Sequence, residues 1–188
     1  FQLYFQGGFN GTNIFDENKS KLTNTAAQRE MSDATAQGGT SGPTVATYRK
    51  ALDLVSDKSS VDIKVLSLPG MRIPAITDYA INTVESRFDT LLIMDIEERD
   101  DLNTVITGSK GVEQNQNTNE IEIKVAVDVE KTARAFRNRA LDSSFAAAYF
   151  PDIVIQDPST LTNVTCPPSV SALSAYSLND TFQEWLAP

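Results

Sequence analysis

Apolar residues recur along most of the chain with two different spacings, which predict helices alternating with strands. Spacings of three and four residues predict a helix that begins near Pro43, a second helix over 74–88 and a third over 128–140. Short apolar runs predict strands at 61–66 and 90–96, and the second run is nearly unbroken, as in a strand covered on both faces. Because this order is typical of βαβ units, we predict an α/β fold with a partly parallel sheet flanked by helices.

Each predicted helix has one apolar face, which we expect to pack against the sheet. The residues expected on these faces are Tyr48, Ala51, Leu52 and Val55 in the first helix, Ile76, Ala80, Val84 and Phe88 in the second, and Val129, Ala133, Phe136 and Ala140 in the third.

An insertion interrupts the alternating order after the second predicted strand. Residues 104–107 and 121–127 are β-prone, and the second segment alternates apolar with polar or small residues, as in a half-exposed strand. They flank a polar loop that contains residues 111–119. We predict a β-hairpin or an edge-strand insertion here.

The chain divides by composition into three parts. Residues 1–8 contain LYFQG, which resembles an engineered protease-cleavage site, so we interpret them as a tag remnant. Residues 9–43 are rich in Gly, Asn, Thr and Ser and are expected to form a polar arm or linker without a core of its own. Residues 44–188 are expected to form the α/β domain.

The segment LDSSFAAAYFPDIVIQDP, residues 141–158, carries a serine pair that resembles a nucleophile. Ser143 and Ser144 lack the flanking glycines of a nucleophile elbow, the chain has no histidine to accept a proton, and no motif ties a lysine to them. We therefore predict a short helix over 143–150, capped by Asp142 or Ser143, and then a strand that begins at Pro151.

Composition excludes several kinds of chemistry. The chain has no histidine, which removes Ser-His-Asp and Cys-His catalysis and any histidine-ligated metal. The single Cys166 excludes an internal disulfide and fits a reducing compartment. A net charge of −9 argues against binding to nucleic acid or to anionic membranes, and no run approaches the roughly 18 apolar residues of a transmembrane helix.

Two loops are candidate ligand sites. The loop 68–74 lies between a predicted strand and helix, where phosphate binds in doubly wound folds, but its only glycine is Gly70, so an ordinary turn is favoured. The acidic run 95–101 begins with Asp95 at the end of a buried strand, a usual ligand position for a metal such as magnesium. Arg99 would partly neutralise this run, and a solvated loop is the favoured interpretation.

A basic stripe lies on the third predicted helix. Lys131, Arg134 and Arg137 are spaced three apart and share a face. The stripe is either solvated, with Glu130 paired to Arg134, or it docks on an acidic patch such as 97–101 of a neighbouring copy. The sequence leaves both alternatives open.

The order of four late segments resembles the tail sheath proteins of contractile phages. They are RFDTLLIMDIEE (87–98), LDSSFAAAYFPDIVI (141–155), TCPPSVSALSAYSLND (165–180) and WLAP (185–188). The resemblance covers about residues 45–188 and rests more on the order of the segments than on any single one.

Three positions depart from the pattern of that family. They are Asp152, where an aromatic residue is usual, Val170, where glycine is frequent, and LND at 178–180, where Arg-x-Asp is frequent. These departures fit a distant member or the sheath of a related contractile injection system.

The resemblance implies a structural protein without catalytic residues, cofactor or metal. Sheath subunits polymerise around an inner tail tube and contract to drive it through the target envelope. The implied partners are other copies of the chain, the inner tail tube protein, and the baseplate and tail terminator proteins, with no nucleic acid and no direct membrane insertion. The implied location is the virion tail, assembled in the host cytoplasm.

The resemblance also implies that the chain is a middle domain. In that family a C-terminal domain with exchanged strands follows the Trp-x-Ala-Pro segment, so we expect this chain alone to be monomeric. Two alternatives remain: a magnesium-dependent doubly wound hydrolase or phosphotransfer domain that uses Asp95, and a virion decoration or binding module.

Overall fold

The computed structural model describes residues 22–34, 38–106, 126–156, 158–159 and 161–182. Its elements in chain order are α2 (Asn24–Ser32), the 3-10 helix η1 (Gly39–Ser41), α3 (Pro43–Ser56), β1 (Val65–Ser67), α4 (Pro74–Arg87), β2 (Leu91–Asp95), α5 (Val129–Asn138), β3 (Ala146–Tyr149), β4 (Ile153–Gln156), β5 (Asn163–Cys166) and α6 (Pro168–Phe182).

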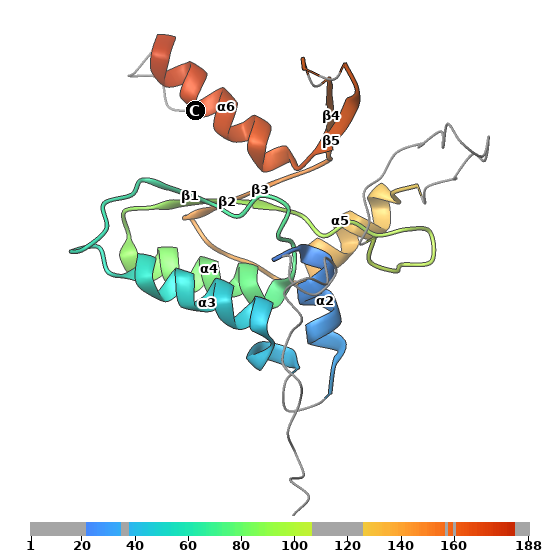
Figure 1. The fold of residues 1–188 in the computed structure, drawn as a ribbon, viewed down its shortest axis with the longest axis horizontal. Helices are drawn as coiled ribbons and strands as arrows, with labels where there is room; N and C mark the ends of the chain where they lie inside the picture. The colour runs from blue at the N-terminus through green and yellow to red at the C-terminus, as the bar shows by residue number, and fades with distance from the viewer. Residues whose placement is uncertain (1–21, 35–37, 107–125, 157, 160, 183–188) are drawn as a thin grey trace, which may run out of the picture.

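A three-stranded parallel sheet in the order β1-β2-β3 forms the centre of the fold. Helices α3 and α4 lie on one side of this sheet, and α6 lies on the other, where it contacts β2 and β3 (Figure 1). Strands β4 and β5 form a separate antiparallel pair on the same side as α6 (Figure 1). The prediction of an α/β fold with a partly parallel sheet is therefore confirmed.

The core lies between the central sheet and the two helices α3 and α4. The predicted face of α4 is buried at Ile76, Ala80 and Val84, and β2 contributes Leu92 and Met94. Both helices begin with proline in their first turn, as the sequence predicts, because the missing N–H would have no partner there.

Phe88 was expected on the buried face of α4, but its side chain is 72% exposed. It follows the last helical residue and adopts a left-handed conformation with φ of 62°, which turns it away from the face of the helix. Its ring instead meets Phe145 edge to face, with 5.5 Å between the centroids.

Residues 24–34 and 38–43 pack with the folded domain, contrary to the expectation of an arm without a core. Ala26 and Ala27 of α2 are buried, and Ala27 joins the main core cluster. Glu30 accepts hydrogen bonds from the backbone N–H groups of Thr44 and Val45, at 2.9–3.0 Å, and so caps the first turn of α3. The remainder of the predicted arm, 9–21, lies outside the described residues.

The predicted helix over 143–150 is wrong, since Ala146–Tyr149 form strand β3. Alanine has the highest helix propensity, but tertiary contacts override propensity here, because the edge of β2 offers a full ladder, with Leu92 opposite Ala146 and Asp95 opposite Tyr149. The strand predicted after Pro151 is observed as β4, which pairs only with β5 and is largely exposed.

Helix α5 forms where predicted but presents a different face. Thr132 is its buried residue, whereas Val129, Ala133 and Ala140 are exposed and Phe136 is only half-buried. A hydrogen bond accounts for this orientation of α5. The Thr132 Oγ accepts from the Arg99 N–H at 2.9 Å, and this contact holds the Thr132 side of the helix against the rest of the domain.

The predicted hairpin after β2 lies mostly outside the described residues. Up to residue 106 the chain forms a turn, closed by an isolated antiparallel bridge between Arg99 and Val105. None of the helices in the described part of the chain is long and apolar enough to cross a membrane.

Candidate functional site

Asp95 lies at the carboxyl end of the central strand β2, as the sequence predicts, and its side chain is fully buried. Its Oδ1 accepts a hydrogen bond from the Ser169 N–H at 2.8 Å. Its Oδ2 accepts two more at 2.8 Å, from the Gly70 N–H and the Ser169 hydroxyl. The carboxylate therefore joins β2 to the loop before α4 and to the first turn of α6.

These contacts engage Asp95 as an acceptor within the protein. A carboxylate has about four acceptor positions, and three hydrogen bonds from the chain itself leave little for a metal ion. Among the residues that the structure describes, no group of three or more Cys, Asp or Glu side chains is placed to hold a metal. The predicted candidate is thus found in the predicted position but bonded as a scaffold residue.

Gly70 explains the single glycine in the loop 68–74. Its φ of +75° is a conformation that other residues rarely adopt, and this turn directs its N–H to Asp95. The amide that a phosphate-binding loop would offer to a ligand is occupied by the carboxylate of the same chain. This geometry agrees with the favoured interpretation of an ordinary turn.

Glu98, from the same acidic run, is buried in an ion cluster that the sequence did not indicate. The Arg72 guanidinium contacts Glu98 at 3.2 Å and also contacts Asp152, which begins the approach to β4. The Arg72 N–H binds the side chain of Asn24, so α2 is tied to the same point. Asp152 is one of the positions at which the chain departs from the sheath pattern, and here it anchors the β4–β5 pair to the domain.

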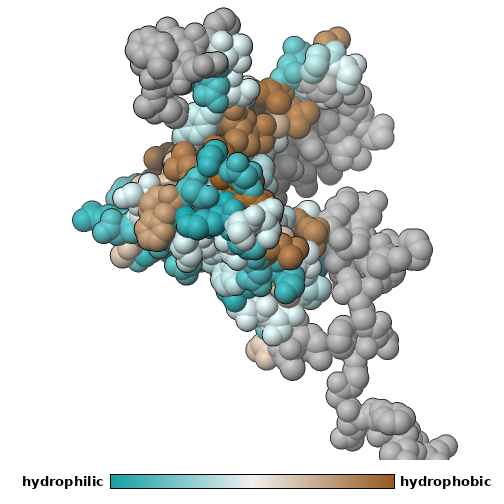
Figure 2. Space-filling view, turned by 90° about the vertical axis from the view of Figure 1, so that its left-hand side faces the viewer, coloured by the Kyte–Doolittle hydropathy of each residue, from teal (hydrophilic) through white to brown (hydrophobic). Residues whose placement is uncertain are grey.

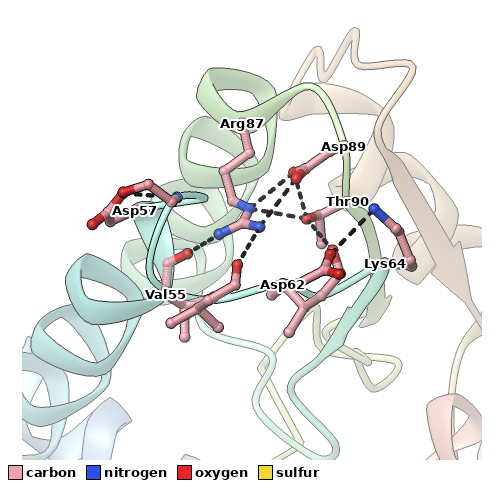
Figure 3. A network of polar contacts seen from close by, with 10 residues as sticks. Val55, Asp57, Asp62, Lys64, Arg87, Asp89 and Thr90 are labelled. Atoms are coloured by element: carbon pink, nitrogen blue, oxygen red, sulfur yellow. Dashed lines mark hydrogen bonds and ion pairs between the residues drawn. The ribbon is translucent and has the colours of Figure 1, made fainter.

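A second buried arginine, Arg87, holds together the other end of the sheet (Figure 3). Its guanidinium is 1% exposed and donates to both carboxylate oxygens of Asp89 and to the Thr90 hydroxyl, at 3.0–3.2 Å. It also donates to the backbone carbonyls of Val55 and Val61, the latter at 2.9 Å. One side chain thus links the end of α3, the segment before β1 and the end of α4.

The serine pair takes a local structural role. The Ser143 Oγ accepts a hydrogen bond from the Phe145 N–H at 3.3 Å, which closes a turn immediately before β3. Ser144 is exposed. The expected helix cap is therefore a turn at the start of a strand, since this segment does not form a helix.

The basic stripe on α5 is paired largely within its own chain. Arg134 contacts Glu130 at 2.6 Å, and Lys131 contacts Asp128 at 3.4 Å and the backbone carbonyl of Asp101. Arg137 is exposed. One alternative from the sequence docks this stripe on the 97–101 segment of another copy. In the structure the stripe and this segment are neighbours within one molecule.

Two tyrosine hydroxyl groups meet between the sheet and α6. Tyr149, at the end of β3, hydrogen-bonds Tyr176 of α6. This hydrogen bond, together with partial burial, raises the pKa of Tyr149 to about 12. The pair gives α6 a second attachment, about two turns beyond the one at Ser169.

Apolar side chains gather on one surface of the molecule. Figure 2 shows them in the upper part of the view, in the region of α6 and the β4–β5 pair. The exposed apolar residues of these elements include Ile155 and Val164, which lie opposite each other on one face of the β4–β5 pair, Val154 on its other face, and Val170 and Leu178 of α6. Such a surface is typical of a site that contacts another protein.

Comparisons with protein families, with curated proteins and with solved structures find no match to this chain.

Proposed function

We propose that the chain is a structural subunit of a contractile tail sheath. In this role it polymerises around an inner tail tube and contracts to drive that tube through the envelope of a target cell. Its partners are other copies of itself, the inner tail tube protein, and the baseplate and tail terminator proteins, and its location is the virion tail. The same reasoning extends to the sheath of a related contractile injection system.

The observation that carries the proposal is the way the resembling segments pack. Strands β2 and β3, which come from two of these segments, pair in parallel. The third segment is joined to both, because Asp95 of β2 binds Ser169 and Tyr149 of β3 binds Tyr176. The described residues of the first three segments therefore form one connected unit, as expected of a scaffold. The fourth segment, 185–188, lies outside the described residues.

The bonding of Asp95 favours a scaffold over the alternative of a magnesium-dependent hydrolase. In that alternative Asp95 would bind the metal at the carboxyl end of β2. Here the carboxylate is buried and accepts three hydrogen bonds that join distant parts of the chain. Metal binding would have to break these bonds and detach the first turn of α6.

The apolar surface on α6 and the β4–β5 pair supports assembly with other protein chains. A subunit in a tube contacts neighbours on several sides, and apolar surface left exposed on one subunit becomes buried in the lattice. A virion decoration protein would need the same kind of surface, so the surface alone does not separate these two proposals.

Electron microscopy of the gene product that contains this chain tests the proposal. A sheath subunit is expected to form tubes of uniform diameter when it is expressed alone or with its inner tube protein. A matched sample with Ile155→Glu and Val164→Glu, which place charge on one exposed apolar face of the β4–β5 pair, should form fewer tubes. Soluble particles without tubes under all conditions, together with magnesium-dependent hydrolysis that Asp95→Asn abolishes, would contradict the proposal.

A further inference from the structure

A cavity of about 390 Å³ lies between α5 and the turn that follows β2. We call it the α5 cavity, and its wall is formed by Arg99, Asn103, Lys131, Arg134, Ala135 and Asn138. A smaller cavity of about 90 Å³ adjoins it, shares Arg99 and Ala135 with it, and is also lined by Glu97 and Arg139.

The wall of the α5 cavity is strongly cationic. Among the described residues that line it there are three basic side chains, Arg99, Lys131 and Arg134, and no carboxylate. This is unusual in a chain whose net charge is −9. Each of these cations also contacts a carboxylate that does not line this wall: Lys131 contacts Asp128 at 3.4 Å, Arg134 contacts Glu130 at 2.6 Å, and Arg99 contacts Glu97 of the smaller cavity at 3.5 Å. An anion in the α5 cavity would therefore meet the sides of these cations that their carboxylate partners leave uncovered.

The lining arginines have hydrogen-bond capacity that the described residues do not use. Arg99 donates from Nη1 to the Asn103 carbonyl at 2.8 Å, whereas its Nε is shielded from solvent and has no partner among the described residues. In the smaller cavity, the Nη2 of Arg139 donates to Thr77 and Asp78, and its Nε and Nη1 have no partner among the described residues. Buried N–H groups almost always have an acceptor, either a protein group or ordered water, so the Nε of Arg99 is available to an oxygen acceptor in the cavities that this residue lines.

The two sides of the α5 cavity are held in a fixed relation. The Arg99 N–H donates to the Thr132 Oγ at 2.9 Å, and the Arg99 carbonyl accepts from the Asp128 N–H at 2.8 Å. The backbone of Arg99 thus joins the turn after β2 to α5, and the guanidinium of the same residue lines both cavities. When cations already lie on two elements that are fixed to each other, binding an anion costs less side-chain entropy.

We propose that the α5 cavity binds the phosphate group of a small anion. Guanidinium groups present paired N–H donors that match phosphate oxygens, and an ammonium group adds a point charge. The amide side chains of Asn103 and Asn138 supply further donors in the wall. A volume of about 390 Å³ falls within the range of roughly 300–1,000 Å³ for small-molecule sites, so the cavity also has room for an organic group attached to the phosphate. This inference does not depend on the proposed sheath function.

The test is a nuclear magnetic resonance titration of the whole ¹⁵N-labelled chain with inorganic phosphate and, separately, with adenosine monophosphate. Potassium chloride holds the ionic strength constant, so that general screening does not change. The site predicts saturable shifts of the backbone amides of Ala135 and Asn138. Tighter binding of adenosine monophosphate than of phosphate would assign an organic phosphate as the ligand, and equal binding would assign the free anion.

Three variants with the same change of charge separate the cavity from the surface of the helix. Lys131→Gln and Arg134→Gln should each weaken binding by about tenfold or more, since each removes a charge-assisted hydrogen bond. Arg137→Gln lies on the same helix but outside the cavity wall, and should leave binding unchanged. Well-dispersed spectra establish that each variant is folded. The proposal is overturned if the wild-type chain shows no saturable shift, or if Arg137→Gln weakens binding as much as the other two variants.

Discussion

The Asp95 carboxylate accepts two hydrogen bonds from Ser169, one from its N–H and one from its hydroxyl, each at 2.8 Å. The two residues are 74 positions apart in sequence. Asp95 ends the central strand, and Ser169 lies in the first turn of α6, so this contact satisfies helix N–H groups that have no partner within the helix. The position of α6 on the sheet depends on it.

Asp95→Asn should lower the free energy of unfolding by about 1.5–3 kcal/mol, because a hydrogen bond to a buried charged acceptor is lost while the shape is kept. Equilibrium unfolding in urea measures the change. The control is Asp101→Asn, an exposed carboxylate in the same acidic run, which should change stability by no more than about 0.5 kcal/mol. Equal effects of the two variants would contradict the anchoring role of Asp95.

Arg87→Lys should lower the free energy of unfolding by about 3 kcal/mol or more, although the charge is kept. Lysine has one nitrogen, whereas Arg87 donates from three nitrogens to Asp89, Thr90 and two backbone carbonyls. Unfolding in urea again gives the value, with the exposed Arg137→Lys as the control. A change of less than 1 kcal/mol for Arg87→Lys would show that the network in Figure 3 contributes little to stability.

Glu30→Gln should loosen the attachment of α2 to α3. The Glu30 carboxylate accepts from the N–H groups of Thr44 and Val45, and loss of such a cap costs about 0.5–2 kcal/mol. Hydrogen exchange followed by mass spectrometry should show faster exchange over 24–47, with little change in β2. Glu130→Gln, which removes an exposed ion pair on α5, serves as the control, and unchanged exchange in α2 and α3 of Glu30→Gln would refute the cap.

The hydrogen bond between Tyr149 and Tyr176 predicts a dependence of stability on pH. The pKa of Tyr149 is raised to about 12 in the folded chain, against about 10 in an unfolded chain. Because the folded state favours the neutral phenol, this contribution is complete below pH 10 and is lost as the pH rises through about 12. Ultraviolet titration of phenolate should detect a late-titrating tyrosine in the wild type that Tyr176→Phe returns toward pH 10. Tyr48→Phe, as control, should leave that late step in place.

The sequence predicts those parts of the fold in which the spacing of apolar residues matches the residues that are buried. In α4 the apolar face recurs with the helical period and Pro74 marks the first turn, so its position and its buried Ile76, Ala80 and Val84 follow from the sequence. Strand β2 is apolar up to Asp95 at its end, and its burial follows in the same way.

The errors occur where long-range contacts decide the local structure. The alanine run in β3 has no strand pattern of its own and becomes a strand because β2 lies beside it. The orientation of α5 depends on the hydrogen bond between Thr132 and Arg99, which hydrophobic periodicity does not reveal. Helix α2 was missed because its buried residues are two alanines in a polar segment.

The sequence predicts the position of Asp95 correctly but does not reveal its hydrogen-bond partners. The sequence placed Asp95 at the carboxyl end of a buried strand, and this position is confirmed. Its partners lie 25 and 74 residues away, so the sequence did not reveal that its oxygens are engaged. The one signal for such a partner is Ser169 itself, a serine that follows two prolines, because serine in this setting is typical of the start of a helix.

Localisation of this chain in intact and contracted particles tests the sheath proposal most directly. Antibodies raised against the chain and coupled to gold would be imaged by electron microscopy on particles from the source of the protein. The proposal predicts label along the outer cylinder of the tail in both states, over a shorter length after contraction. Label on the capsid or on fibres, with none along the tail cylinder, would contradict the sheath assignment and favour a decoration or binding module.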